Sequence, residues 1–171
     1  MMENIYNAIT NDCQLGEIAV MLDGDDSFIG TNVLSFLNAV YQKEKLAMMW
    51  NNFIQITTNS RPAMGFSRSY ENYDVSYKHY RATGMFYSSH LKSFFVDLFR
   101  QIKVEDLQTY DGKFYGGASD TAIMLSMIEM SYPRWKYVPE IVYEYRYDTG
   151  QEGMVVNRVA QGQALAKITK T

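Results

Sequence analysis

The sequence contains one cysteine, three prolines and no apolar run long enough to cross a membrane. Cys13 has no partner for an internal disulfide, so the simplest setting for the protein is a reducing compartment. Glu3 and Asn4 place polar groups near the N-terminus, unlike the apolar core of a secretory signal peptide. We therefore expect a cytoplasmic protein without a membrane span.

A surplus of positive charge is also missing. Lys and Arg number 16 against 19 Asp and Glu, which gives a net charge of −3 and a pI near 5.4. Non-specific nucleic-acid binding depends on surplus basic residues, so we expect no nucleic-acid partner. Apolar residues, in contrast, make up 47% of the sequence, the composition of a folded chain. Its 171 residues favour a single domain spanning 1–171 with a sizeable core.

Segments with helical and extended patterns alternate, which favours an α/β fold. In chain order we expect a helix in 1–11, a strand in 17–22, a helix after Thr31, a strand in 46–58, a long loop in 59–84, an extended segment and then a helix in 88–102, a helix in 116–131, an extended segment in 135–147 and a weaker helix in 154–170. Thr31 and Ser119 are plausible helix N-caps, and Pro139 predicts a sheet edge or a bulge.

The most informative stretch is EIAVMLDGDDSFIG, residues 17–30, in which an apolar strand runs directly into Asp23, Asp25 and Asp26. Carboxylates this close repel one another unless solvent, a cation or hydrogen-bond donors take up the charge. Because a helix follows, the acids should lie at the carboxyl end of a strand, where open α/β sheets bind their ligands. The stretch therefore predicts either a ligand site or a solvated acidic turn.

Three kinds of ligand site could use these acids. An EF-hand calcium loop is excluded, because Phe28 stands where its glycine must turn and Leu34 where its bidentate Glu must reach. A hydrolase with an aspartate nucleophile also needs a later Lys that the sequence does not reveal. An Asp-x-Asp motif that binds a divalent cation on a nucleotide-sugar diphosphate needs few protein ligands, and DGD meets that requirement.

The segment IAVMLDGDDSFIGTNVLSFLNAVY resembles the Asp-x-Asp segment of family-2-like glycosyltransferases with the GT-A fold. It is similar in particular to the glycosyltransferase-like proteins of large DNA viruses. Further blocks resemble that family in the same order: YRATGMFYSSHLKSF, LFRQIKVEDLQTYDGKFY, SDTAIMLSMIEM and YVPEIVYEYR. Together the blocks cover nearly the whole chain.

The resemblance implies a GT-A-like mixed sheet flanked by helices, and a set of binding residues. The enzyme would move a sugar from a UDP- or GDP-sugar donor to a hydroxyl of a glycan or protein acceptor. Asp25 would ligate Mn²⁺ or Mg²⁺ on the donor diphosphate, and Asp23 would contact the same metal or the donor ribose. Asp26 would belong to the same donor-binding group.

The resemblance also implies catalytic and acceptor-side residues. Asp120 matches the acidic position that serves inverting members as general base. His90 and Arg81 match positions that line the cleft. Inversion of the sugar's configuration is therefore the expected outcome of transfer.

Several features depart from the family's pattern. Ser27 and Phe28 stand where an aromatic residue directly follows the acids, and Ser126 replaces a helix proline. GT-A domains also begin with base-binding strands ahead of Asp-x-Asp, and we expect these to be missing. Residues 17–22, interpreted as a central parallel strand, would then pair with residues 46–58, with a second chain in a homodimer, or with a missing N-terminal segment. The alternative function is an inactive remnant that serves as a binding module.

Overall fold

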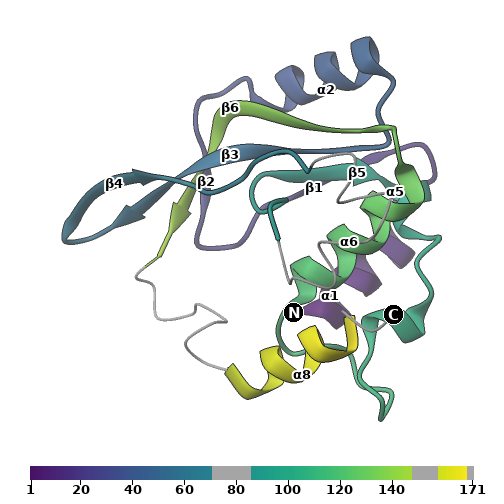
Figure 1. The fold of residues 1–171 in the computed structure, drawn as a ribbon. Coiled ribbons are helices and arrows are strands. Elements are labelled where there is room, and N and C mark those ends of the chain that lie inside the picture. The colour runs from purple at the N-terminus through teal and green to yellow at the C-terminus, as the bar shows by residue number, and fades with distance from the viewer. Residues whose placement is uncertain (71–85, 148–157, 169–171) are drawn as a thin grey trace.

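The computed structural model describes residues 1–70, 86–147 and 158–168 of the chain. Its elements are α1 (Met2–Asn7), a π-helical turn (Ala8–Asp12), β1 (Ile18–Met21), β2 (Ser27–Phe28), α2 (Val33–Glu44), β3 (Met48–Thr57), β4 (Ser60–Met64), β5 (Lys92–Phe95), α5 (Val96–Phe99), a 3-10 turn (Val104–Leu107), α6 (Ser119–Ser131), β6 (Trp135–Arg146) and α8 (Arg158–Ile168). The strands form one mixed sheet in the order β1-β5-β3-β6-β2, with β4 paired to β3. Helices cover both faces, α2 on one and α1, α6 and α8 on the other (Figure 1). The predicted α/β class, a mixed sheet flanked by helices, is confirmed.

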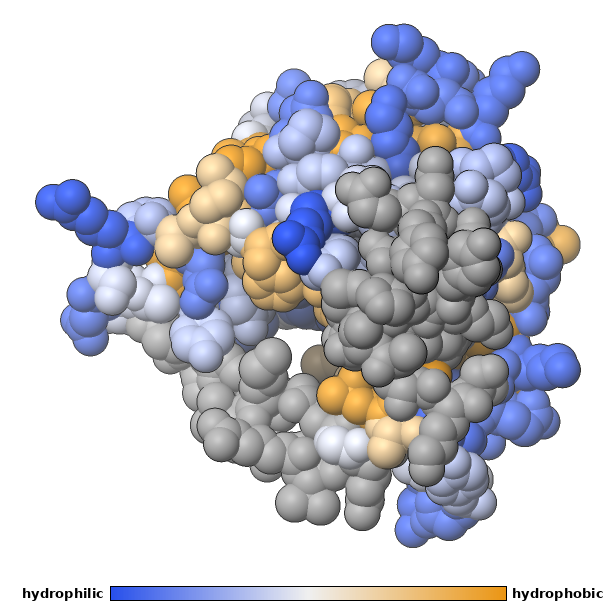
Figure 2. Space-filling model, in the orientation of Figure 1, coloured by the Kyte–Doolittle hydropathy of each residue, from blue (hydrophilic) through white to orange (hydrophobic). Residues whose placement is uncertain are grey.

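Each face of the sheet has its own apolar core, because successive side chains of β3 point to opposite faces. Met48 and Trp50 belong to the core beneath α6, whereas Met49 and Phe53 belong to the core beneath α2. Trp50 is fully buried, and its ring lies 5.2 Å from that of Trp135. Polar side chains cover the outer side of α2 at the top of Figure 2, with apolar ones beneath them. The domain is thus a helix–sheet–helix sandwich.

β1 is an edge strand, so its prediction as a central parallel strand was wrong. Within the described residues it pairs only with β5, and it does so antiparallel, with Met21 opposite Lys92. Its side chains are half-buried. They are apolar on both faces because Ile18 and Val20 reach the α2 core while Ala19 and Met21 reach the α6 core. Contact with two cores, rather than a central position in the sheet, explains the pattern.

β6 confirms the bulge that Pro139 predicted. It runs parallel to β3, and the register slips where Asn51 faces Val138 but Asn52 faces Ile141. Two residues of β6, Pro139 among them, are therefore extra at this point. The side-chain amide of Asn51, on β3, donates to the carbonyl of Val138 at 3.2 Å. This hydrogen bond connects the two strands at the position where the register shifts.

The helix starts differ from the predicted caps. α2 begins after Asn32 rather than Thr31, and α6 begins after Ala118, with Ser119 as its first residue. Ala118 takes up a left-handed conformation with φ +56°. No side chain caps either start among the residues described. None of the described helices is both long enough and apolar enough to cross a bilayer.

Strands β2 and β4 were not predicted, whereas β5 lies in segment 88–102, whose start was predicted to be extended. β4 occupies the first part of the predicted loop 59–84 and forms a hairpin with β3, which projects from the body in Figure 1. The later part of that loop falls largely in 71–85, outside the described residues. β5 fills the sheet between β1 and β3, and α5, which follows it directly, is as short as β5, with four residues each.

Candidate active site

The acidic segment after β1 forms a turn that β6 holds in place. The backbone N–H of Asp26 donates to the carbonyl of Asp23 at 3.1 Å and closes the turn. The Tyr143 hydroxyl accepts from the backbone N–H of Asp23 at 3.3 Å and donates to the Asp26 carboxylate at 2.6 Å. The backbone N–H of Arg146 donates to the other Asp26 oxygen at 2.8 Å. Hydrogen-bond donors from one strand therefore take up part of the acidic charge.

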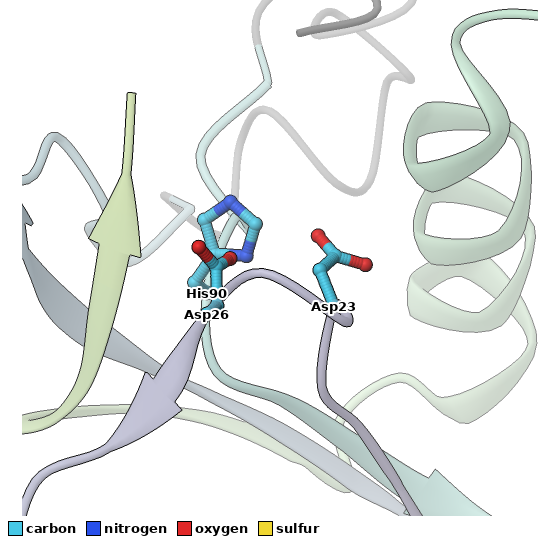
Figure 3. Close-up of side chains that lie close together, drawn as sticks. All are labelled: Asp23, Asp26 and His90. Carbon is cyan, nitrogen blue, oxygen red and sulfur yellow. The ribbon is translucent and has the colours of Figure 1, made fainter. Parts of the chain in front are cut away.

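Asp23 and Asp26, from the acidic turn, come together with His90, from the segment before β5 (Figure 3). One ligand atom from each residue lies within 4.8 Å of the other two. Asp23 follows β1, Asp26 precedes β2 and His90 precedes β5, so the folded sheet creates the group. Carboxylate oxygens and an imidazole nitrogen are ligands that divalent metals accept in proteins. The donor set therefore fits a divalent cation.

His90 is held among aromatic rings. It is 7% exposed and stacks on Tyr143 at 4.8 Å and on Tyr145 at 4.9 Å between ring centres. The Phe53 ring meets it edge-on at 5.1 Å. Burial, with a smaller contribution from the Lys92 charge, lowers the pKa of His90 to about 3. The imidazole is neutral at pH 7, the form that binds metals.

Lys92 and Asp120 form an ion pair between β5 and the first turn of α6. Lys92 Nζ donates to Asp120 Oδ2 at 2.6 Å, with side-chain exposures of 1% and 31% respectively. Burial raises the pKa of Asp120, but the charge and hydrogen bond of Lys92 outweigh it and leave that pKa below 3.8. Asp120 is therefore an anion at neutral pH, fixed in position by a buried cation.

Excess negative charge remains around this pair. Burial is the main cause that raises the pKa of Asp23, against the opposing charge of Lys92, and it also raises the pKa of Asp26. Asp120 and Asp26 add to the effect on Asp23 by like-charge repulsion. A bound cation would offset both the desolvation and the repulsion.

The structure brings together most of the site residues predicted from the sequence. Asp23, Asp26 and His90 are neighbours, and the charge of Asp120 reaches Asp23. Asp25 lies in the same turn, half-buried, but is not one of the three clustered residues, so its role as a metal ligand stays a prediction. Arg81 falls within 71–85, outside the described residues.

Sequence reasoning missed two residues of the site. Lys92 could have been found from the sequence, because it is the single charged residue in the mostly apolar segment 91–96. A buried strand rarely carries a Lys unless the side chain is paired. Tyr143 gave no signal, because the sequence has 14 tyrosines and its role depends on which strand faces the acidic turn.

No protein-family model matches this chain, and no curated protein matches it. The resemblance to glycosyltransferases therefore rests on the sequence blocks quoted above.

Proposed function

We propose that the protein is a metal-assisted glycosyltransferase of the GT-A type, acting in the cytoplasm. It would transfer a sugar from a UDP- or GDP-sugar to a hydroxyl of a glycan or protein. One observation carries the proposal: the acidic turn after β1 and the ionised Asp120 share one site, bridged electrostatically by Lys92. Ligand groups at the carboxyl end of a strand, opposite the start of a helix, are typical of open α/β enzymes.

The acidic turn would bind the donor. Asp23 and Asp26 would hold the metal, with Asp25 as the further ligand that the sequence resemblance implies. When bound, a divalent metal supplies a Lewis acid that offsets charge on the leaving diphosphate. Tyr143 fixes both ends of the turn, so the carboxylates need little rearrangement when the donor arrives.

Asp120 would act on the acceptor. Its carboxylate would accept the proton of the acceptor hydroxyl while that oxygen attacks the anomeric carbon, which inverts the configuration there. Lys92 holds one carboxylate oxygen, and the side chain keeps 31% exposure, enough for an acceptor to approach. His90 and Arg81 are proposed to lie along the acceptor's path.

A second candidate function is a catalytically inactive remnant that binds a partner or glycan. Two observations favour it. The lowered pKa of Asp120 makes it a weak base, since general bases work best with a pKa near the operating pH. The described residues also provide no strand beyond β1 to build a nucleotide-base pocket.

Calorimetry with a panel of nucleotide-sugars separates the two functions. We expect UDP- or GDP-sugar binding to need Mn²⁺ or Mg²⁺, and to collapse in Asp25→Ala. The matched control is Asp111→Ala, which removes an exposed carboxylate paired with Lys113 on the surface. Donor binding that persists unchanged in excess chelator would contradict the metal-assisted mechanism. Binding of a glycan with no nucleotide-sugar binding would favour the remnant.

A further inference from the structure

The place on the acceptor's path proposed for His90 does not explain its buried ring nitrogen. His90 Nδ1 has no hydrogen-bond partner among the residues that the structure describes, although the side chain is almost fully buried. We propose that His90 is a nitrogen ligand which completes, with Asp23 and Asp26, a metal site that prefers transition-metal ions such as Mn²⁺ to Mg²⁺. The inference deepens the proposed function, on which its biological meaning rests.

An unpartnered buried nitrogen points to a missing ligand. Leaving such a group unsatisfied is unfavourable, because it has lost its water without gaining a partner. The ligand atoms of Asp23, Asp26 and His90 lie within 4.8 Å of one another. A metal about 2.0–2.2 Å from three such atoms holds them about 3–4 Å apart from one another. A pair of ligand atoms at the 4.8 Å limit would therefore close by about 1 Å or more around the ion.

Tyr143 positions two of the three ligands. Its ring stacks on His90, and its hydroxyl donates to the Asp26 carboxylate. A carboxylate has about four lone-pair positions, so the two hydrogen bonds to Asp26 leave room for a metal. Partners that orient ligands in this way are a regular feature of protein metal sites.

The chemistry of the donor set decides the metal. Mg²⁺ prefers oxygen ligands in a near-ideal octahedron and gives up its water reluctantly. An imidazole nitrogen favours transition metals, and nitrogen and oxygen sites bind Mn²⁺ less tightly than Co²⁺ or Ni²⁺. A site with one imidazole and two carboxylates therefore discriminates against Mg²⁺, whereas an all-carboxylate turn would not.

The first experiment titrates Mn²⁺ into the full chain and counts free Mn²⁺ by electron paramagnetic resonance, with Mg²⁺ as competitor. We expect Mn²⁺ to bind at least about tenfold more tightly than Mg²⁺. His90→Phe keeps the ring that stacks on Tyr143 and removes the nitrogen. This variant should bind Mn²⁺ at least about tenfold more weakly than the parent, and the difference between its Mn²⁺ and Mg²⁺ affinities should be smaller. His79→Gln, at the other histidine of the sequence, is the matched control and should bind as the parent does.

A second measurement avoids any loss of folding in the variant. Long-range ¹H–¹⁵N spectra of the parent chain, with and without Zn²⁺, report directly on histidine ring nitrogens. Zn²⁺ should shift the nitrogens of one histidine only, and the His79→Gln spectrum assigns it as His90. Unshifted His90 nitrogens, or equal Mn²⁺ affinity in folded His90→Phe, would overturn the inference.

Donor binding and sugar transfer measured in parallel separate this inference from the proposed function. Sugar transfer that continues in excess chelator, together with no detectable Mn²⁺ binding, would contradict the metal site but not the transferase function. Mn²⁺ binding that depends on His90, with neither donor binding nor sugar transfer, would support the metal site and contradict the transferase function.

Discussion

At the scale of single residues, the Lys92–Asp120 pair combines the proposed chemistry with stability. Asp120→Asn should lower sugar transfer by roughly 10² to 10⁴, the usual contribution of a general base. The variant should also be less stable, because the buried Lys92 loses its counter-charge. Breaking a buried pair costs up to about 3–5 kcal/mol. We expect urea denaturation to show a clear loss of stability.

The double variant Lys92→Met/Asp120→Asn separates the two effects. Removing both charges leaves no unpaired buried ion, so the loss of stability should be smaller than the sum of the two single losses. Transfer should stay low in the double variant. Recovery of transfer together with stability would show that Asp120 has only a structural role.

His90 should make the folded state sensitive to acid. Its pKa is about 3 when folded and near 6.5 when unfolded, so the unfolded chain binds more protons between these values. Stability should therefore fall as pH decreases through this window, by up to about 1.4 kcal/mol per unit. The free energy of unfolding, measured with chelator at pH 7 and pH 5, should drop by about 2 kcal/mol more in the parent than in His90→Phe. An equal drop in both would contradict burial of a neutral His90.

At the scale of elements, the acidic turn depends on a hydroxyl from another strand. Tyr143→Phe keeps the buried ring and removes the bonds to Asp23 and Asp26. A lost buried hydrogen bond to a charged group costs about 1.5–3 kcal/mol. We expect denaturant unfolding to show a loss of this size. Tyr132→Phe, at a partly exposed ring, is the control and should be close to neutral.

How far the elements could be predicted depends on the length of each pattern. The helices in 33–44 and 119–131 and the strands in 48–57 and 135–146 carry long apolar patterns, and the sequence located all of them. β5 is short and contains Lys92 and Ser93, so alternation could not identify it. The edge position of β1 was beyond reach because pairing depends on distant segments. The acids could be found because they are neighbours in the sequence. Tyr143 could not be found, because it meets them only through the pairing of distant segments.

At the scale of the whole molecule, the outer edge of β1 borders a groove. Residues of β1 and α2, among them Val20 and Leu37, line a cavity of ≈ 880 Å³ there. None of the residues that the structure describes pairs with this edge, and an open strand edge beside apolar side chains invites pairing with another strand. We propose that an N-terminal segment of a longer chain pairs with this edge of β1. The second candidate is another copy of the chain in a homodimer.

Amide exchange on the isolated chain tests the edge. In Ile18–Met21, amides bonded to β5 should exchange slowly and those on the open side quickly. Sedimentation over a dilution series should show self-association at high concentration, with slower exchange of the open amides. A stable monomer at every concentration, with all of these amides protected, would show that the chain covers its own edge.

Tyr143 also sets the order in which a growing chain can build its site. It bonds to Asp23 across 120 positions of sequence, so a ribosome makes the acidic turn long before it makes the residue that holds it. Until β6 emerges, the nascent chain carries unneutralised carboxylates, and β3 lacks its parallel partner. The binding group is thus one of the last features to form during synthesis, and a chain released before residue 143 would lack it however well its earlier helices folded.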